Sequence, residues 1–379
     1  MGNKCHTLAV FIGRFQPFHI GHRHVLDALS GDVDSTLVLV GSAYRPRSWK
    51  NPFTFAERRD FIRAGTQDLR MPVDILPLID TLYNDRSWAS NVRTAVRLYL
   101  RAKGLIEDQV RIVLTGFEKD SSSRYLSWFP EWEMRPADPS RHKGKIVNAT
   151  DLREALFFPG GEEFGKVSER FGNREVAQAA AWVKTNPKAT EAIQAEGAYN
   201  KAYIDKTRRA EREFGYPIPI NTSDSVVIQS GHVLLVRRGV QPGKSTLALP
   251  GGHIARGETS LKAAIRELYE ETRLDMPKGV LEGRLRSRKI FDHPERSERG
   301  WVRTEAFFFE LQDRKHMEKV RGGDDAAEEL GGKAIWVPLN EITPDEMFED
   351  HFDILQTFVP EVATSYSSIL MAHVAEIGR

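Results

Sequence analysis

Four short apolar runs, separated by longer amphipathic segments, dominate the first third of this chain. The runs cover residues 8–12, 36–40, 73–78 and 111–114. Before the last run, Trp88, Val92, Val96 and Tyr99 recur at the spacing of one helix face. Strands that alternate with helices form parallel sheets with right-handed crossovers, and such sheets bind ligands at the carboxyl ends of their strands. The sequence therefore predicts an α/β domain with a doubly wound, Rossmann-like parallel sheet.

The remainder of the chain changes character twice. Residues 157–214 are polar and alanine-rich, which predicts helices, and Pro217 and Pro219 then interrupt the pattern. Runs at 225–229 and 233–237 flank Ser230-Gly231 as in a hairpin, and further runs follow at 306–311 and 334–337. We expect an N-terminal domain over residues 1–185, a helical connector and linker over 186–220, and an α+β domain over 221–379.

Composition limits the partners of the chain. The 54 lysines and arginines balance 53 acidic residues, so no bulk charge favours nucleic acid or membranes. Cys5 is the single cysteine, which fits a reducing compartment. The sequence shows neither a leader pattern nor about 18 consecutive apolar residues. We expect a cytoplasmic protein with no nucleic-acid or membrane partner; a homo-oligomer is compatible with the sequence.

The segment 13–22, GRFQPFHIGH, follows the first run and precedes a helical pattern. A helix N-terminus offers unpaired amides and a positive dipole to phosphate, and Gly13 lets a phosphate approach the backbone. His19 and His22 are three residues apart and can face one anion, while Arg14 adds positive charge. The alternative is that both histidines only cap or pack the turn.

A second phosphate motif is predicted near the end of this domain. Thr150 is expected to cap a short helix, and Arg153, one turn later, reaches the same side. A plain capping motif is the alternative. No serine, cysteine or lysine in this half stands in a context that would activate it for covalent catalysis, which favours direct in-line transfer.

The first motif resembles the HxGH nucleotidyltransferase superfamily, in the form found in nicotinamide mononucleotide adenylyltransferases of the archaeal and bifunctional type. The likeness covers residues 7–158. It extends to residues 41–43, 51–54, 57–58, 83–85, 119–123 and 129–130, and to 148–153, where Asn148 and Ala149 replace two serines of the family pattern.

This resemblance implies that the phosphate of nicotinamide mononucleotide attacks the α-phosphorus of ATP and releases pyrophosphate, with Mg²⁺ carried by ATP. Another nucleotide acceptor or a phosphorylated vitamin is the alternative. Trp88 could stack on nicotinamide or simply pack in the core. The implied roles are catalysis for His19, His22, Arg14 and Arg153, ATP binding for Gly13, Phe15, Gly21 and Thr150, and mononucleotide binding for Asn84 and Trp88.

A carboxylate-rich helix is predicted in the C-terminal domain. Glu267, Glu270 and Glu271 share one helix face and offer hard oxygen ligands for Mg²⁺ or Mn²⁺. Arg266 is expected to brace this face by pairing with Glu258. A solvated charged face is the alternative.

The segment from Gly252 to Leu274 resembles the Nudix box, and the likeness covers residues 221–355. Arg273 stands where the box has a glycine in left-handed geometry. The resemblance implies an ADP-ribose pyrophosphatase with Glu270 and Glu271 in catalysis and Arg296 and Arg299 on the substrate. The hydrolytic base stays open among Glu271, Asp325 and Glu328. A sensor that binds ADP-ribose or a dinucleotide without cutting it is the alternative.

Overall fold

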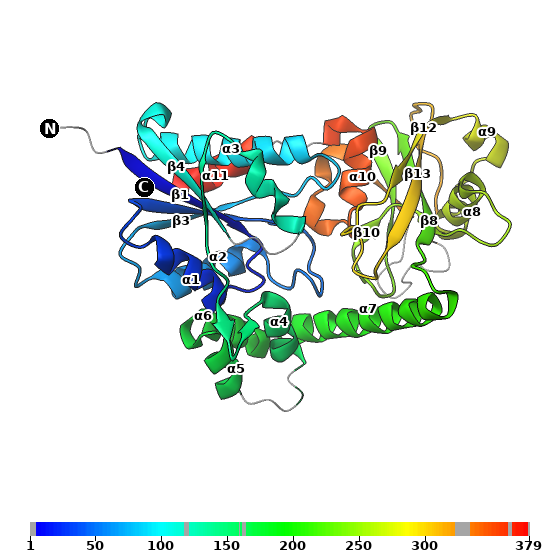
Figure 1. Ribbon diagram of the computed structural model, residues 1–379. Coiled ribbons are helices and arrows are strands. Elements are labelled where there is room, and N and C mark those ends of the chain that lie inside the picture. The colour runs from blue at the N-terminus through cyan, green and yellow to red at the C-terminus, as the bar shows by residue number, and fades with distance from the viewer. Residues whose placement is uncertain are drawn as a thin grey trace. The chain divides into compact units, whose positions relative to one another are not determined.

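The computed structural model describes residues 5–116, 121–158, 160, 164–322, 334–362 and 366–377 (Figure 1). Residue contacts divide the chain into two compact units, residues 1–194 with 364–379 and residues 195–363. This division differs from the expected boundaries. Helix α7 (Pro187–Phe214) continues from the first unit into the second, and the last helix, α11 (Tyr366–Ile377), belongs to the first unit.

The first unit is built on a sheet of five parallel strands in the order β3-β2-β1-β4-β5. The strands are β1 (His6–Gly13), β2 (Ser35–Val40), β3 (Val73–Pro77), β4 (Val110–Gly116) and β5 (Glu133–Pro136). The first four were predicted from their apolar runs. The chain builds outward on one side of β1 and then resumes at β4 on the other side, so the crevice of a doubly wound sheet lies at the carboxyl ends of β1 and β4.

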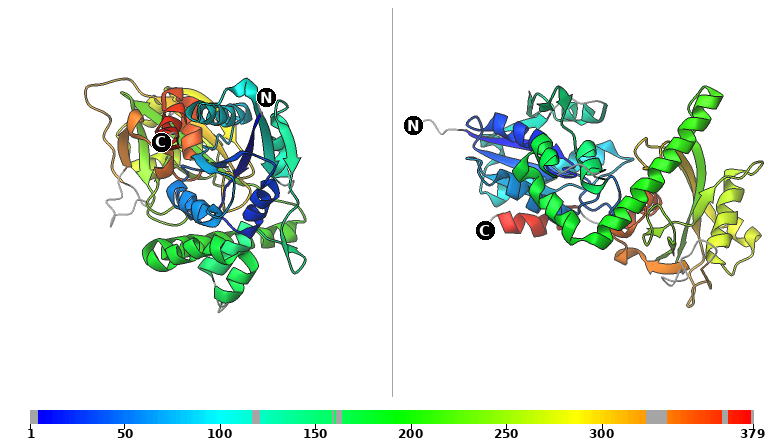
Figure 2. Two further views of the ribbon diagram at one scale, coloured as in Figure 1. Left: turned by 90° about the vertical axis from the view of Figure 1, so that its left-hand side faces the viewer. Right: turned by 90° about the horizontal axis from the view of Figure 1, so that it is seen from below.

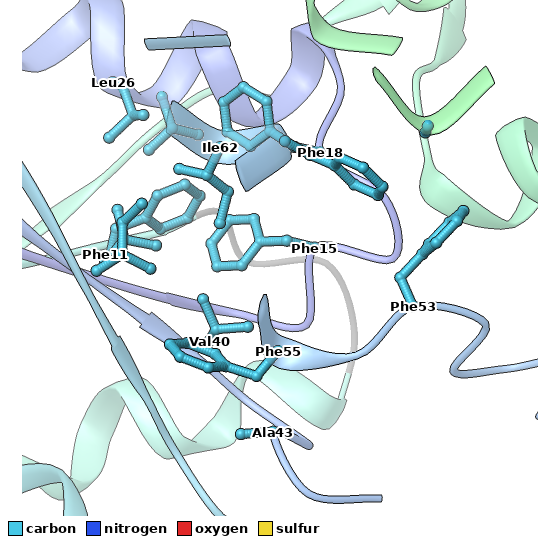
Figure 3. Close-up of a cluster of buried hydrophobic side chains, with 14 of the residues drawn as sticks. Phe11, Phe15, Phe18, Leu26, Val40, Ala43, Phe53, Phe55 and Ile62 are labelled. Atoms are coloured by element: carbon cyan, nitrogen blue, oxygen red, sulfur yellow. The ribbon is translucent and has the colours of Figure 1, made fainter. Parts of the chain in front are cut away.

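Helices cover both faces of this sheet (Figure 1). Helices α1 (Ile20–Leu29) and α2 (Phe55–Thr66) lie on one face, and α3 (Asp85–Ala102) lies with α11 on the other. Figure 3 shows the core of the first face, where Phe11, Phe15 and Phe18 pack against Leu26 and Ile62. Apolar side chains on a 3.6-residue period explain why these helices dock on the sheet.

Helix α11 presents a buried face to the first unit through Tyr366, Leu370 and Val374, which lie four residues apart. The Tyr366 hydroxyl donates to the Pro77 carbonyl at 2.7 Å, and the Tyr44 hydroxyl lies 3.0 Å from Nε2 of His373. The first strand and the last helix of the chain therefore lie in the same unit (Figure 2).

The region predicted to be helical, residues 157–214, is mostly helical among its described residues, with breaks between the helices. Helices α4 (Ala149–Phe157), α5 (Phe164–Phe171) and α6 (Asn173–Thr185) precede α7. A small hairpin of β6 (Arg141–His142) and β7 (Lys145–Ile146) comes just before α4. No helix within the described ranges is both long and apolar enough to cross a membrane.

The second unit holds a mixed seven-stranded sheet with the central order β10-β9-β8-β13-β12. The predicted hairpin is present, because Ser230 and Gly231 take positive φ values of 48° and 71° between β8 and β9. Helix α8 (Ser260–Thr272) packs on the sheet through Ala264, Ile265 and Leu268. The other elements are β8 (Ile220–Gln229), β9 (His232–Arg237), β10 (Leu247–Ala248), β11 (Gly251–His253), α9 (Lys278–Glu282), β12 (Leu285–Phe291), β13 (Val302–Glu310), β14 (Ala334–Pro338) and α10 (His351–Phe358).

Candidate active sites

The turn after β1 brings both predicted histidines to the start of α1. His19 is the N-cap; its Nδ1 accepts the Gly21 amide at 3.1 Å, while Nδ1 of His22 accepts the His19 amide at 3.3 Å. Both histidines therefore cap the turn, as the alternative reading proposed. Capping does not exclude phosphate binding, because a neutral ring that accepts at Nδ1 carries its proton on Nε2 and donates there. The two ring centroids are 3.8 Å apart, so both rings can contact the same phosphate group.

Close packing explains the glycines of this turn. A Cβ atom on Gly13 would lie 2.9 Å from the Phe15 ring, and one on Gly21 would lie 2.9 Å from the His19 ring. Phe15 has a positive φ of 51°, and its side chain is buried in the core (Figure 3). The prediction of an ATP contact at Phe15 therefore has to be restricted to its backbone, since the buried ring has no surface to offer a ligand.

Arg153 joins the two predicted phosphate motifs. Its Nη1 donates to the Gln16 carbonyl at 2.9 Å, and its Nη2 donates to the Thr150 hydroxyl at 3.3 Å. Thr150 is not the cap of α4, contrary to the prediction. Asn148 takes that place, and its Oδ1 accepts the Asp151 amide at 2.9 Å, because asparagine is a strong N-cap and the helix begins one residue before the threonine.

Arg58, on α2, ties the loops of this site together. Its guanidinium donates to the carbonyls of Arg14, Gly41 and Ser42 at 2.6, 2.7 and 2.9 Å. Arg58 is 1% exposed, whereas Arg14 is exposed beside it. Sequence reasoning gave Arg58 no role of its own, because an arginine within a charged helix gives no sign of burial. These bonds fix the ends of β1 and β2 relative to each other.

The two residues predicted to bind the mononucleotide lie at the start of α3. Asn84 is the N-cap, and its Oδ1 accepts the Ser87 amide at 3.0 Å. Trp88 is half-buried, with its ring edge-on to Tyr125 at 5.3 Å and to Trp128 at 5.8 Å. Trp88 therefore packs against neighbouring rings, as the alternative proposed, and its half-buried side chain leaves the contact with nicotinamide a prediction. Residues 117–120, which include part of the predicted family motif, lie outside the described residues.

In the second unit, helix α8 carries the predicted acidic face. Arg266 donates to both carboxylate oxygens of Glu258 at 3.0 Å, as expected, and also to Glu267 at 2.8 Å and Glu270 at 2.9 Å. The Arg266 hydrogen bond lowers the pKa of the Glu258 carboxyl below its usual range. Glu271 instead accepts the Gly251 amide at 3.0 Å.

These carboxylates have the right donor chemistry for a divalent cation, but they do not converge. Among the described residues, no three histidine, cysteine or acidic side chains group around one point. The reason is local, because Arg266 engages Glu267 and Glu270 while Glu271 turns toward β11. Hard oxygen donors on a single helix face still fit Mg²⁺ or Mn²⁺. A Cβ atom on Gly252 would lie 2.5 Å from Oε1 of Glu267, so only a glycine leaves room for the Glu267 carboxylate at this place.

Arg273 ends α8 in left-handed geometry, with φ 48° and ψ 39°. Its amide donates to the Tyr269 carbonyl at 3.0 Å. The helix therefore ends as it would with a glycine, although an L side chain in this conformation costs about 1 kcal/mol.

A pocket opens beside the acidic face, and both predicted substrate arginines line it. Arg296 is 4% exposed and donates twice to Asp350 at 2.9 Å, while Arg299 donates to Glu349 at 3.1 Å. A diphosphate would therefore share these guanidinium groups with carboxylates. Other candidates for the hydrolytic base, Asp325 and Glu328, lie outside the described residues.

Two buried titratable residues of the pocket had no sequence signal. His351 accepts the Leu249 amide at Nδ1 at 2.9 Å, and burial lowers its pKa to about 3. Burial raises the pKa of Asp224 to about 6, although the Thr304 hydroxyl donates to it at 2.6 Å. Asp224 lies between two serines and His351 follows Asp350, so their polar neighbours in the sequence gave no sign that the two side chains are buried.

Comparison with known proteins follows the division of the chain. Residues 10–94 match the cytidylyltransferase-like family, and residues 220–358 match the NUDIX domain family. A nicotinamide/nicotinic acid mononucleotide adenylyltransferase of Acinetobacter baylyi is 34% identical over 149 residues, which are 39% of this chain and 74% of that protein. The chain belongs to this adenylyltransferase family. A Nudix domain follows the adenylyltransferase domain, so both resemblances drawn from the motifs are confirmed.

Solved structures contain the same combination of domains. A bifunctional NMN adenylyltransferase/ADP ribose pyrophosphatase from Francisella tularensis is 29% identical, covers 94% of this chain and 100% of its own, and superposes with a TM-score of 0.79. A structure of that protein complexed with AMP and a Mn ion gives a TM-score of 0.78 at 28% identity. The match to an archaeal relative is shorter. It covers 51% of the nicotinamide-nucleotide adenylyltransferase of Saccharolobus solfataricus, with 40% identity over 88 residues.

Proposed function

We propose that the adenylyltransferase domain joins nicotinamide mononucleotide to ATP and that the Nudix domain hydrolyses ADP-ribose. One observation carries this proposal. The chain aligns over 94% of its length with a structure described as having both activities, and both predicted motifs lie at their expected places, one at the carboxyl end of β1 and the other on α8. Nicotinamide mononucleotide, ATP and ADP-ribose are the proposed small-molecule partners.

In the adenylyltransferase domain, a phosphate oxygen of the mononucleotide bonds to the α-phosphorus of ATP, and the bond to the β-phosphate breaks to release pyrophosphate. The amides at the start of α1 and the Nε2 protons of His19 and His22 would stabilise charge on the α-phosphate. Arg153 bonds to the backbone of the turn before α1 and to Thr150, so it can add its charge at the same place. Arg58 would keep the participating loops aligned.

In the Nudix domain, water attacks a phosphorus atom of ADP-ribose, and the products are AMP and ribose 5-phosphate. Glu267, Glu270 and Glu271 would hold a divalent cation, for which we propose Mg²⁺ with Mn²⁺ as a substitute. Such a cation neutralises diphosphate charge and lowers the pKa of bound water. Holding it requires Arg266 to release Glu267 and Glu270.

The adenylyltransferase proposal is tested by separating the capping role of His19 from its chemical role. Asparagine keeps an acceptor for the Gly21 amide but removes the Nε2 proton, so His19→Asn should lower NAD formation by about a hundredfold with little change in thermal unfolding. Products formed from ATP, Mg²⁺ and nicotinamide mononucleotide are identified by mass. His24→Asn, at an exposed histidine of the same helix, is the control. Equal activities of the two variants would make His19 a turn residue only.

The Nudix proposal is tested with Glu270→Gln, which removes one anionic ligand at constant volume. ADP-ribose hydrolysis should be abolished while NAD formation stays within about twofold of wild type, since the two sites lie in separate units. Glu282→Gln, at an exposed glutamate outside α8, is the control. Wild-type protein that binds ADP-ribose without cutting any nucleoside diphosphate derivative would favour a sensor.

A further inference from the structure

Helix α7, which lies within the connector predicted from the sequence, contributes Tyr199 to the lining of the Nudix pocket. From residue 195 onward it belongs to the second unit, although the Nudix family match begins only at residue 220. Oε1 of Glu196, a buried side chain, accepts the Gly243 amide at 3.0 Å. The Tyr203 hydroxyl lies 3.2 Å from Nε2 of His253, which ends β11. These bonds fix the second part of α7 against the sheet on which α8 packs.

Tyr199 stands on this fixed part of α7 and lines the pocket. Its ring centroid is 6.1 Å from that of Tyr203, with the planes 28° apart, so one side of the ring rests on an anchored neighbour. Tyr199 is nevertheless 39% exposed. A large ring held in place at a pocket, yet left partly open to solvent, is typical of a ligand contact more than of a core residue.

Two other aromatic rings among the described pocket residues, Phe348 and His351, are already covered. Phe348 is 4% exposed, with the guanidinium carbon of Arg238 4.1 Å and that of Arg299 5.7 Å from its centroid. His351 is buried and engaged with the Leu249 amide. His253 also lines the pocket and is exposed, but its Nε2 is engaged with the Tyr203 hydroxyl at 3.2 Å. Within the part of the pocket that the structure describes, Tyr199 is therefore the six-membered aromatic ring with surface available to a flat ligand.

We propose that Tyr199 stacks on the adenine of the nucleoside diphosphate sugar and is the base-binding residue of the hydrolase. The proposal rests on the proposed Nudix activity. The pocket has acidic residues Glu267 and Glu271 at one part and arginines such as Arg299 at another, which suit a cation and a diphosphate, but neither group recognises a base. A ring of the linker helix supplies that missing contact, since adenine binds aromatic side chains by stacking.

The test uses full-length protein and compares Tyr199→Ala with Tyr199→Phe. Loss of the ring should raise KM for ADP-ribose about tenfold and leave kcat within about twofold, because stacking contributes to binding and not to the chemical step. The phenylalanine variant keeps the ring and should match wild type. Tyr216→Ala, which removes a tyrosine that is 63% exposed and outside the pocket, is the matched control.

Two product inhibitors separate base recognition from a structural role. Inhibition of hydrolysis by AMP should weaken about tenfold in Tyr199→Ala, whereas inhibition by ribose 5-phosphate, which has no base, should not change. Equal weakening of both inhibitors, or of neither, would overturn the proposal. If wild-type protein does not hydrolyse ADP-ribose, the proposed activity fails, and calorimetric titration of AMP into wild type and Tyr199→Ala still decides whether the ring binds the base.

Discussion

Replacing Arg58 by methionine removes the group that bonds the carbonyls of Arg14, Gly41 and Ser42. Methionine replaces the aliphatic stem of the arginine but not its guanidinium, so it leaves three buried acceptors without this donor. Each such loss costs about 1–3 kcal/mol, and removing a buried charge recovers part of the sum. Burial lowers the pKa of Arg58 to about 9, so the guanidinium is still charged at neutral pH. We expect a net loss of about 3 kcal/mol from the first unit.

Hydrogen exchange followed by mass spectrometry measures this loss of stability separately for each peptide. A decrease of about 3 kcal/mol speeds exchange about a hundredfold in peptides from β1 and β2, while peptides from β8 and β9 in the other unit should not change. In calorimetry the transition of the first unit should fall by about 6–12 °C. KM for ATP should also rise, since the loops of the phosphate site lose their common anchor.

Arg63→Met is the matched control, because Arg63 lies on the same helix and its side chain is exposed. It should change neither exchange in β1 and β2 nor KM for ATP. The reasoning is refuted if the two variants protect β1 and β2 equally, because the three carbonyl bonds would then contribute nothing measurable.

Two further outcomes follow from the second unit. Gly252→Ala places a Cβ atom 2.5 Å from Oε1 of Glu267. Steady-state assays should therefore show at least about a tenfold loss of ADP-ribose hydrolysis with NAD formation intact. The control Gly279→Ala, at a glycine with open space around it, should change neither activity. The pKa of His351 is lowered to about 3 by burial, so its contribution to stability is complete above about pH 6.5 and is lost as pH falls toward 3. His351→Asn keeps an acceptor for the Leu249 amide but does not titrate. Between pH 7 and 5 the free energy of unfolding, measured with denaturant, should fall by about 2 kcal/mol more for wild type than for the variant. An equal fall for both proteins would mean that His351 takes up a proton in the folded state.

Local rules predicted the parts of this molecule that depend on local chemistry. β1 to β4 are buried on both faces, which is why they read as continuous apolar runs. The shared face of Glu267, Glu270 and Glu271 follows from helix spacing. The pairing of Arg266 with Glu258, which precedes α8, was expected for the box motif and is present.

What sequence reasoning missed depends on contacts between distant residues. The docking of α11 rests on pairs such as Tyr366 with Pro77, which are 289 residues apart, and no local pattern reports them. Tyr199 was visible only as one of several aromatic residues in a helical segment, because its proposed role depends on the pocket, which other elements build, and on Tyr203, which contacts His253. The cap of α4 shows a smaller error, since Asn148 and Thr150 are both capping residues and only the helix start distinguishes them.

The place of α11 has a consequence for synthesis on the ribosome. The Nudix unit is one continuous stretch, residues 195–363, whereas the adenylyltransferase unit needs residues 364–379 from the very end of the chain. Chains fold as they emerge, domain by domain. The unit whose translation begins first is therefore the last of the two to close its core. Until α11 has been synthesised, the surface of α3 and β3 that it covers is open to chaperones or to other nascent chains. A premature stop codon just after residue 363 would release a finished hydrolase attached to an unfinished synthase.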